Sequence, residues 1–158
     1  MNFSPVLKKQ SKESYTITWE DGELVPTQEG IFELIRAIKD PEHEYTLEDL
    51  GVVSLEGIQI DSSLEESMEP REWKIIRIEI IPTIPHCSMV GLIGLSILYK
   101  LSKVLNSRYI PRVHIKKGTH SLDKEMTRQL ADCERTFSAF INTDIQSILE
   151  SLVVGLLK

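Results

Sequence analysis

Residues 73–101 have the sequence WKIIRIEIIPTIPHCSMVGLIGLSILYKL, and they predict a strand, a short loop and a helix in that order. The first part, 73–81, is rich in β-branched residues that alternate with polar ones, which is typical of a strand. Pro82 and Pro85 end this strand because proline lacks the backbone N–H that a sheet requires. Beyond them, apolar residues over 89–105 recur at helical spacing and indicate a long, largely buried helix.

The residues before this stretch predict its partner strand and two helices. Residues 52–60 also alternate, so they form a hairpin with 73–81, joined by the polar and acidic connection 61–71. A helix is predicted over 27–40, where a threonine precedes apolar residues at helical spacing and an Asp-Pro pair stops the pattern. A second helix of about one turn is predicted over 46–51, which begins like a capping box and ends in glycine.

The residues after the long helix predict one more strand and two more helices. Residues 109–115 form the strand, and Pro111 within it favours an edge position. One helix follows over 122–140 and a last one over 144–157. The resulting order is α-α-β-β-α-β-α-α, an α+β domain with a small mixed three-stranded sheet packed with helices. Within the long helix, the glycines at 91 and 94 predict that another element approaches closely.

Length and pattern predict one domain preceded by a tail. We expect a flexible N-terminal arm over 1–26 and one globular domain over 27–158. Within the arm, Tyr15, Ile17 and Trp19 alternate with polar residues and leave open a short strand.

Composition excludes several classes of protein. Residues 1–70 hold 5 basic and 16 acidic side chains, and the later residues show no dense Lys/Arg block, so we expect no direct nucleic-acid binding. No apolar run is long enough to span a bilayer, and the first thirty residues lack the apolar core of a secretory signal. Two cysteines do not form a disulfide framework. These features predict a cytoplasmic protein, with the nucleus as a second location, and no membrane association.

Cys87 is the main candidate for chemistry. It lies where a strand ends and a helix begins, and the partial positive charge of a helix N-terminus favours a thiolate, which is a nucleophile and a soft metal ligand. The alternative is that Cys87 is a small buried hydrophobic residue. His86 beside it would suit a thiol-dependent enzyme, but no nucleophile elbow or orienting acid is identifiable. We therefore expect no catalytic residues, and keep an enzyme using Cys87 with His86 or His120 as the alternative.

His120 is the second candidate, because it follows the strand 109–115 and would approach Cys87 if that strand pairs beside 73–81. Together with a carboxylate from Glu42 or Glu48, these two side chains would suit zinc or iron, and we name Cys87, His120 and Glu48 as the metal set. The alternative is that Thr119 and His120 cap the following helix.

Cys133 lies on the apolar stripe predicted for 122–140, so its position alone predicts a packing role.

Several separated segments carry a resemblance to a known family. They are PTIPHCSM at 82–89 with LIGLS at 92–96, IRAIKDPEH at 35–43, TLEDL at 46–50, GTH at 118–120, QLAD at 129–132, and the single residues Lys124, Glu134, Arg135 and Asn142. Together they resemble the signature of the eukaryotic cytosolic iron-sulfur assembly component-two family. The resemblance covers roughly residues 27 to 153. It departs from the family at Cys133, at Leu152 and in the longer connection 61–71. A lysine is usual at position 133, so Cys133 should be less buried than its apolar stripe implies.

The resemblance implies a non-catalytic subunit of the targeting complex that delivers clusters to cytosolic and nuclear apoproteins through Cys87. The implied partners are a WD-repeat propeller, a HEAT-repeat adaptor and client apo-iron-sulfur proteins, with a homodimer as a further option. The implied cofactor is a transient iron-sulfur cluster or zinc, with none tightly bound. One thiol cannot supply the four protein ligands that a cluster normally takes, so we expect other chains to complete the site.

Overall fold

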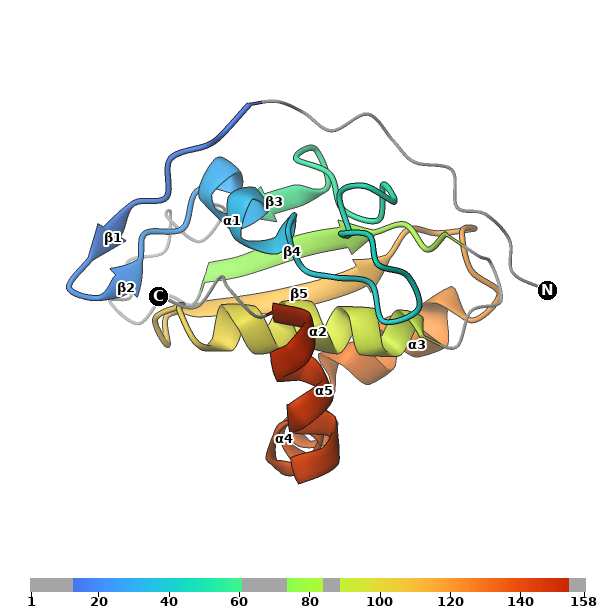
Figure 1. The fold of residues 1–158 in the computed structure, drawn as a ribbon. Helices are drawn as coiled ribbons and strands as arrows, with labels where there is room; N and C mark the ends of the chain where they lie inside the picture. The colour runs from blue at the N-terminus through green and yellow to red at the C-terminus, as the bar shows by residue number, and fades with distance from the viewer. Residues whose placement is uncertain (1–12, 61–73, 84–88, 154–158) are drawn as a thin grey trace.

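A computed structural model describes residues 13–60, 74–83 and 89–153 of the chain (Figure 1). Its main sheet has the order β3-β4-β5, formed by β3 (Ile58–Ile60), β4 (Lys74–Ile80) and β5 (Tyr109–Ile115). β3 and β4 are antiparallel, whereas β4 and β5 are parallel. The predicted α+β domain with a small mixed three-stranded sheet is confirmed, and Pro111 lies in an edge strand as expected.

The helix α2 (Val90–Ser102) connects the two parallel strands and runs alongside them (Figure 1). Its Ile93, Ile97 and Leu101 are buried in the same core as the isoleucines at alternate positions 76, 78 and 80 of β4. A helix is the usual connection between parallel strands, because the chain must return to the starting end of the sheet. The strand and the helix predicted within 73–101 therefore form the centre of the domain, and 84–88 between them lie outside the described residues.

The N-terminal residues contain a small hairpin, formed by β1 (Trp19–Glu20) and β2 (Glu23–Leu24). Asp21 and Gly22 between them have positive φ angles of 53° and 79°, which suits a two-residue turn matched to the twist of a hairpin. The N–H of Leu24 donates to the carbonyl of Val104 at 2.9 Å, and Tyr15 packs edge-on against Phe32. Residues 13–26 thus contact the domain. The short strand begins only at Trp19, the last residue of the alternation, and 13–18 form no strand. Movement of residues 1–26 as an arm stays a prediction.

The first helix, α1 (Gln28–Ile35), begins as predicted at Thr27, whose Oγ1 accepts from the N–H of Gly30 at 2.9 Å. The predicted one-turn helix over 46–51 was wrong. Thr46 and Asp49 do exchange the two hydrogen bonds of a capping box, at 3.0 and 3.2 Å, but the backbone forms only turns. Gly51, with φ +69°, ends the segment before a helix can propagate.

The single helix predicted over 122–140 was also wrong, because the helix is interrupted at Asp132 and two helices form instead. α3 (Asp123–Ala131) ends there and α4 (Cys133–Ile141) begins. Asp132 has an extended backbone, and its carboxylate accepts from the N–H groups of Glu134 and Arg135 at 3.1 and 3.2 Å. An aspartate that caps the following turn competes with continuation of the helix, whereas the apolar periodicity runs on across the break.

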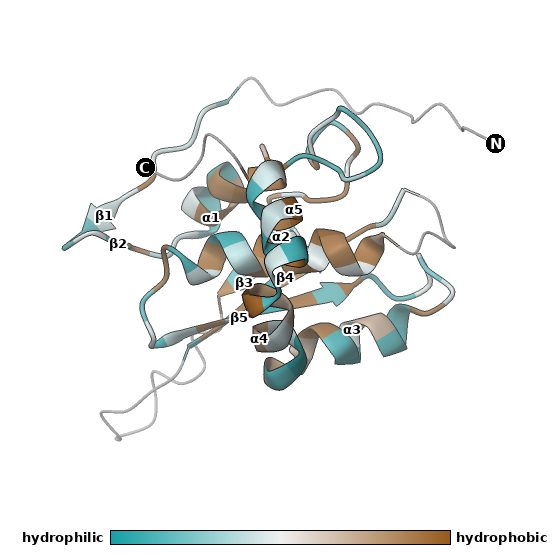
Figure 2. Ribbon diagram, turned by 60° about the horizontal axis from the view of Figure 1, so that its bottom comes forward, coloured by the Kyte–Doolittle hydropathy of each residue, from teal (hydrophilic) through white to brown (hydrophobic). Residues whose placement is uncertain are grey.

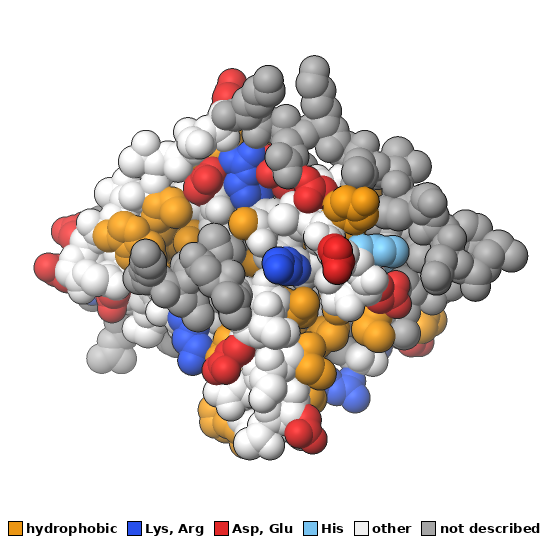
Figure 3. Space-filling model, in the orientation of Figure 1, with side chains coloured by type: hydrophobic (Ala, Val, Ile, Leu, Met, Phe, Trp, Pro, Cys, Tyr) orange, Lys and Arg blue, Asp and Glu red, His pale blue; other side chains and the backbone are white. Residues whose placement is uncertain are grey.

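The last helix, α5 (Thr143–Val153), packs against α2 and α4. The observed order is β-β-α-β-β-α-β-α-α-α, which corrects the predicted one. α4 and α5 project away from the sheet, and hydrophobic side chains are exposed around them (Figures 1 and 3). Phe137, Ile141 and Ile148 are the most prominent of these.

α3 is largely polar and buries only Leu130, yet it lies against α2 (Figure 2). A Cβ atom placed on Gly91 would lie 2.7 Å from Cε of Met126, and one on Gly94 would lie 2.5 Å from Cδ1 of Leu130. Real Cβ contacts are longer than this, so the two glycines permit the approach of α3. The predicted close approach at 91 and 94 is confirmed.

Candidate functional site

The candidate site lies where the parallel strands β4 and β5 end. Parallel strands present their carboxyl ends at one edge of a sheet, so the segments that follow Ile80 and Ile115 leave that edge together. The N–H of Lys116 donates to the carbonyl of Ile80 at 2.9 Å, and the N–H of Ile81 donates to Val52 at 2.9 Å. The segment after Ile80 leads to Cys87, and the segment after Ile115 leads to His120.

His86 and Cys87 lie in 84–88, outside the described residues. The structure describes the elements on either side of them: β4 ends at Ile80, and α2 begins at Val90. Each boundary lies one residue from the predicted one, which was 81 for the end of the strand and 89 for the start of the helix. The roles of His86 and Cys87 stay predictions.

His120 is buried, with 7% of its surface exposed. Its Nδ1 accepts a hydrogen bond from the N–H of Leu122 at 3.0 Å, so Nδ1 carries no proton and the ring hydrogen lies on Nε2. Thr119 Oγ1 donates to the carbonyl of Lys116 at 2.6 Å. Both side chains therefore hold the turn that leads into α3. Neither caps the helix as the alternative supposed, because the N-cap residue is Leu122 and no side chain caps the helix there.

Asp123 strengthens the same turn from the first residue of α3. Its Oδ2 accepts from the N–H of Gly118 at 3.0 Å, and Oδ1 accepts from Lys124 at 2.7 Å. These two backbone donors, that of Gly118 first, lower the pKa of the Asp123 carboxyl. Because Gly118 has a φ of +85°, the turn also requires a residue that tolerates the left-handed region. The segment carrying His120 is thus fixed at both ends.

Glu48 is occupied by an ion pair with Arg36. Its two carboxylate oxygens accept from Nη2 and Nε of Arg36 at 2.7 and 2.8 Å, a bidentate arrangement. Arg36 also pairs with Glu33 at 2.7 Å, and its guanidinium lies 4.9 Å from the ring centre of Phe32. The hydrogen bond to Glu48 is the largest cause that raises the pKa of Arg36, while burial acts in the opposite direction. A metal ion would compete with Arg36 for these carboxylate oxygens of Glu48.

Glu42 is exposed, and its N–H donates to Oδ1 of Asp40 at 2.8 Å. Within residues 13–60, 74–83 and 89–153, no group of three or more His, Cys, Asp and Glu side chains is arranged to hold a metal ion. Cys87 lies outside those residues, so the metal set of Cys87, His120 and Glu48 stays a prediction.

Cys133 is exposed at the first position of α4. The packing role predicted from its apolar stripe was wrong, because the break at Asp132 separates Cys133 from the helix that carries Met126 and Leu130. The expectation from the family resemblance, that Cys133 is less buried than its stripe implies, is confirmed.

Lys100 is a residue whose character the sequence analysis missed. It is fully buried in α2, and in the described part of the chain its Nζ has no hydrogen-bond partner. Burial lowers the pKa of this ammonium from 10.5 to about 8. The sequence signal for this buried lysine was its place inside a run of apolar residues.

The described residues thus form a small α+β domain. Hydrogen bonds of a turn hold the segment between β5 and α3, and the segment that carries Cys87 connects β4 to α2 in the chain. No helix in the described residues is long and apolar enough to span a membrane. No protein-family model matches the chain.

Individual relatives do match. The chain is 41% identical to cytosolic iron-sulfur assembly component 2B of Mus musculus over 151 residues, covering 94% of this chain and 87% of the mouse protein. It is 38% identical over 157 residues to the MIP18 family protein galla-2 of Drosophila melanogaster, covering 98% and 95% of the two chains. It is 34% identical over 154 residues to Protein AE7 of Arabidopsis thaliana, covering 95% and 92%. The chain belongs to the MIP18 family, that of cytosolic iron-sulfur assembly component 2.

Proposed function

We propose that this protein is a non-catalytic subunit of the cytosolic iron-sulfur assembly machinery that delivers clusters to apoproteins through Cys87. The observation that carries the proposal is the 41% identity to a protein named as a cytosolic iron-sulfur assembly component, over 94% of the chain. The fold is consistent with it, since the segment with Cys87 lies between a strand end and a helix start.

The proposed chemistry is ligation rather than catalysis. A thiolate binds iron strongly, and the positive end of α2 favours the thiolate form of a nearby cysteine. Iron-sulfur clusters take four protein ligands, so Cys87 would share the cluster with a partner or a client, and the cluster is cargo rather than a resident cofactor. His120 and Glu48, the other two residues of the predicted metal set, are engaged in contacts with Leu122 and Arg36, which supports ligands from another chain.

The proposed partners are a WD-repeat propeller, a HEAT-repeat adaptor and apo-iron-sulfur clients, and the proposed location is the cytoplasm and the nucleus. An affinity-tagged chain expressed in eukaryotic cells tests this. We expect it to recover a WD-repeat propeller, and we expect depletion of the chain to lower the ⁵⁵Fe content of cytosolic client enzymes. Unchanged iron in all tested clients after depletion would contradict the proposal.

A further inference from the structure

The helix α4 is amphipathic, yet it buries none of its nine residues. Phe137 and Ile141 are its most exposed apolar side chains, at 65% and 62%. Cys133 lies one turn before Phe137 and is exposed too. Because residues four apart are neighbours on a helix, these three side chains form a continuous apolar row, called here the α4 ridge. Single exposed hydrophobic residues are common, whereas a continuous group of them is typical of an interaction surface.

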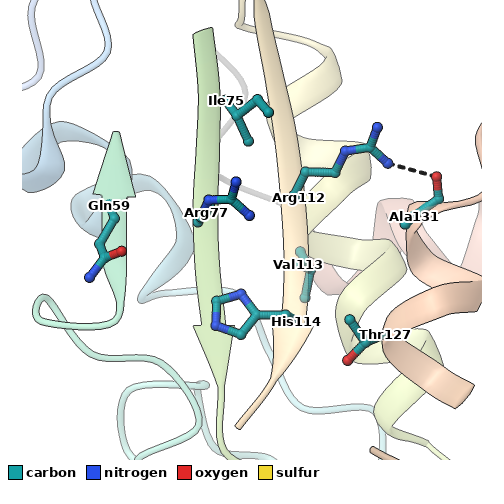
Figure 4. Close-up of a pocket in the computed structure, with 8 residues that line it drawn as sticks. All are labelled: Gln59, Ile75, Arg77, Arg112, Val113, His114, Thr127 and Ala131. Atoms are coloured by element: carbon teal, nitrogen blue, oxygen red, sulfur yellow. Dashed lines mark hydrogen bonds between the residues drawn. The ribbon is translucent and has the colours of Figure 1, made fainter. Parts of the chain in front are cut away.

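Another side of α4 is fixed to the domain, so the α4 ridge is held in one orientation. Phe140 packs edge-on against Tyr99 of α2, with 5.4 Å between the ring centres. Just before α4, Nη1 of Arg112 donates to the carbonyl of Ala131 at 2.7 Å, which joins the end of α3 to β5 (Figure 4). α4 and α5 project away from the sheet (Figure 1). The ridge is therefore preorganised for binding and open to solvent.

The spacing of the α4 ridge defines the shape of its partner. Side chains at i, i+4 and i+8 form a row that packs into the groove between such rows on another helix. An added strand would require unpaired backbone groups at a sheet edge, and the face of a helix offers none. The ridge extends over about two turns, so it suits a helix that has an apolar stripe of similar length.

The charges beside the α4 ridge define the sign of its partner. Glu134 lies three residues before Phe137 on the same face, and Asp144 follows Ile141 by three residues at the beginning of α5. Both are exposed, and among the described residues neither carboxylate has an ion-pair partner. Arg135 is two positions from Phe137 and so points away from the ridge. Acidic groups beside the ridge attract a basic partner, whereas they repel nucleic acid, an anionic membrane and the same face of a second copy.

We infer that the α4 ridge binds an amphipathic helix of a partner protein, with lysine or arginine residues beside its apolar stripe. The stripe would cover Phe137 and Ile141, and the basic side chains would lie against Glu134 and Asp144. This inference depends neither on cluster delivery nor on Cys87.

The test titrates the ¹⁵N-labelled full chain with an acetylated, amidated peptide of leucine and lysine, about 14 residues long so that it can form a helix. Its leucines recur at steps of three and four. We expect chemical-shift changes at the amides of α4 and of the first turn of α5. F137Q and I141Q should each weaken binding about tenfold, because each removes an apolar side chain from the contact, and F137L should retain most of it. E134Q and D144N should each weaken binding about twofold to threefold, and added salt should weaken it as well.

Trp19 provides the matched control, because it is an exposed aromatic side chain on the β1–β2 hairpin, apart from α4 (Figure 1). W19Q should bind the peptide like the unchanged chain, and melting temperatures establish that each variant is folded. Undiminished binding by F137Q and I141Q would overturn the inference. So would equal or tighter binding of a leucine–glutamate peptide of the same pattern, binding of the ridge to anionic lipid vesicles in place of the peptide, or sedimentation of the unchanged chain as a dimer that F137Q converts to a monomer.

Discussion

Arg36 and Lys100 are both buried cations, but among the described residues only Arg36 has ion-pair partners. Arg36, 8% exposed at the end of α1, is bound by the carboxylates of Glu33 and Glu48 and lies over the ring of Phe32. Lys100, fully buried in α2, has no hydrogen-bond partner for Nζ among the described side chains and backbone. The pKa of Arg36 is raised, whereas that of Lys100 is lowered to about 8.

The difference shows that burial alone does not decide whether a charge stabilises a fold. Removing a charge from water is costly, and hydrogen-bonded opposite charges offset that cost. Arg36 joins α1 to the segment carrying Glu48, so its ion pairs also connect two parts of the chain. Lys100 has no such compensation in the core among the described residues, so we expect it to lower the free energy of unfolding at neutral pH.

The largest expected effect is that of Arg36→Met. This change leaves the carboxylates of Glu33 and Glu48, with side chains 26% and 14% exposed, without their shared cation. We expect the free energy of unfolding to fall by about 3–5 kcal/mol, measured by urea denaturation. A loss below about 1 kcal/mol would show that the ion pairs do not compensate for burial.

Lys100→Met tests the other side of the comparison. It keeps the long aliphatic shape and removes the buried ammonium, so we expect the free energy of unfolding at pH 7 to rise by about 1–3 kcal/mol. The same urea denaturation measures it. A destabilised variant would mean that the ammonium has a stabilising partner.

The pH dependence of stability gives an independent measure of Lys100. Because its pKa is lower in the folded chain than in the unfolded chain, the unfolded state binds more protons between pH 8 and 10.5. Stability contributed by Lys100 therefore rises as the pH increases through this range. Other groups titrate there too, so the measured quantity is the difference between the unchanged chain and Lys100→Met. We expect this difference to shrink from pH 8 to 10.5, and a constant difference would contradict the lowered pKa.

Arg36→Lys has the smallest expected effect. It keeps the positive charge but cannot form the two parallel hydrogen bonds to Glu48, so we expect a loss of about 1 kcal/mol. Urea denaturation of Arg36→Lys and Arg36→Met side by side separates the contribution of the charge from that of the guanidinium geometry. Equal losses for both variants would mean that geometry, not charge, accounts for the effect of Arg36.

The sequence predicted those features that depend on local pattern. The strand and helix within 73–101, the edge position of Pro111, and the close approach at Gly91 and Gly94 all follow from periodicity or from a special residue type. Asp132 shows a limit of periodicity, since the apolar spacing continues across the break between α3 and α4 while a capping aspartate ends it.

Features that depend on pairing between distant segments could not be predicted. The register that places Arg77 beside Arg112 is fixed by the parallel pairing of β4 and β5, and no local pattern specifies it. The ion pair of Arg36 with Glu48 joins residues on two different segments. For the candidate site, the sequence placed the Cys87 segment between its strand and helix, but it did not predict that Glu48 is committed to Arg36 or that the ring of His120 accepts from Leu122.

The most direct test of the central claim is the ⁵⁵Fe content of a cytosolic iron-sulfur enzyme in cells that depend on Cys87→Ala. Cys133→Ala is the matched control, since Cys133 is the exposed second cysteine of the chain. Both variants should be present at the same level and with the same melting temperature. We predict that iron incorporation is lost with Cys87→Ala and kept with Cys133→Ala. Normal incorporation with Cys87→Ala would contradict delivery through this cysteine.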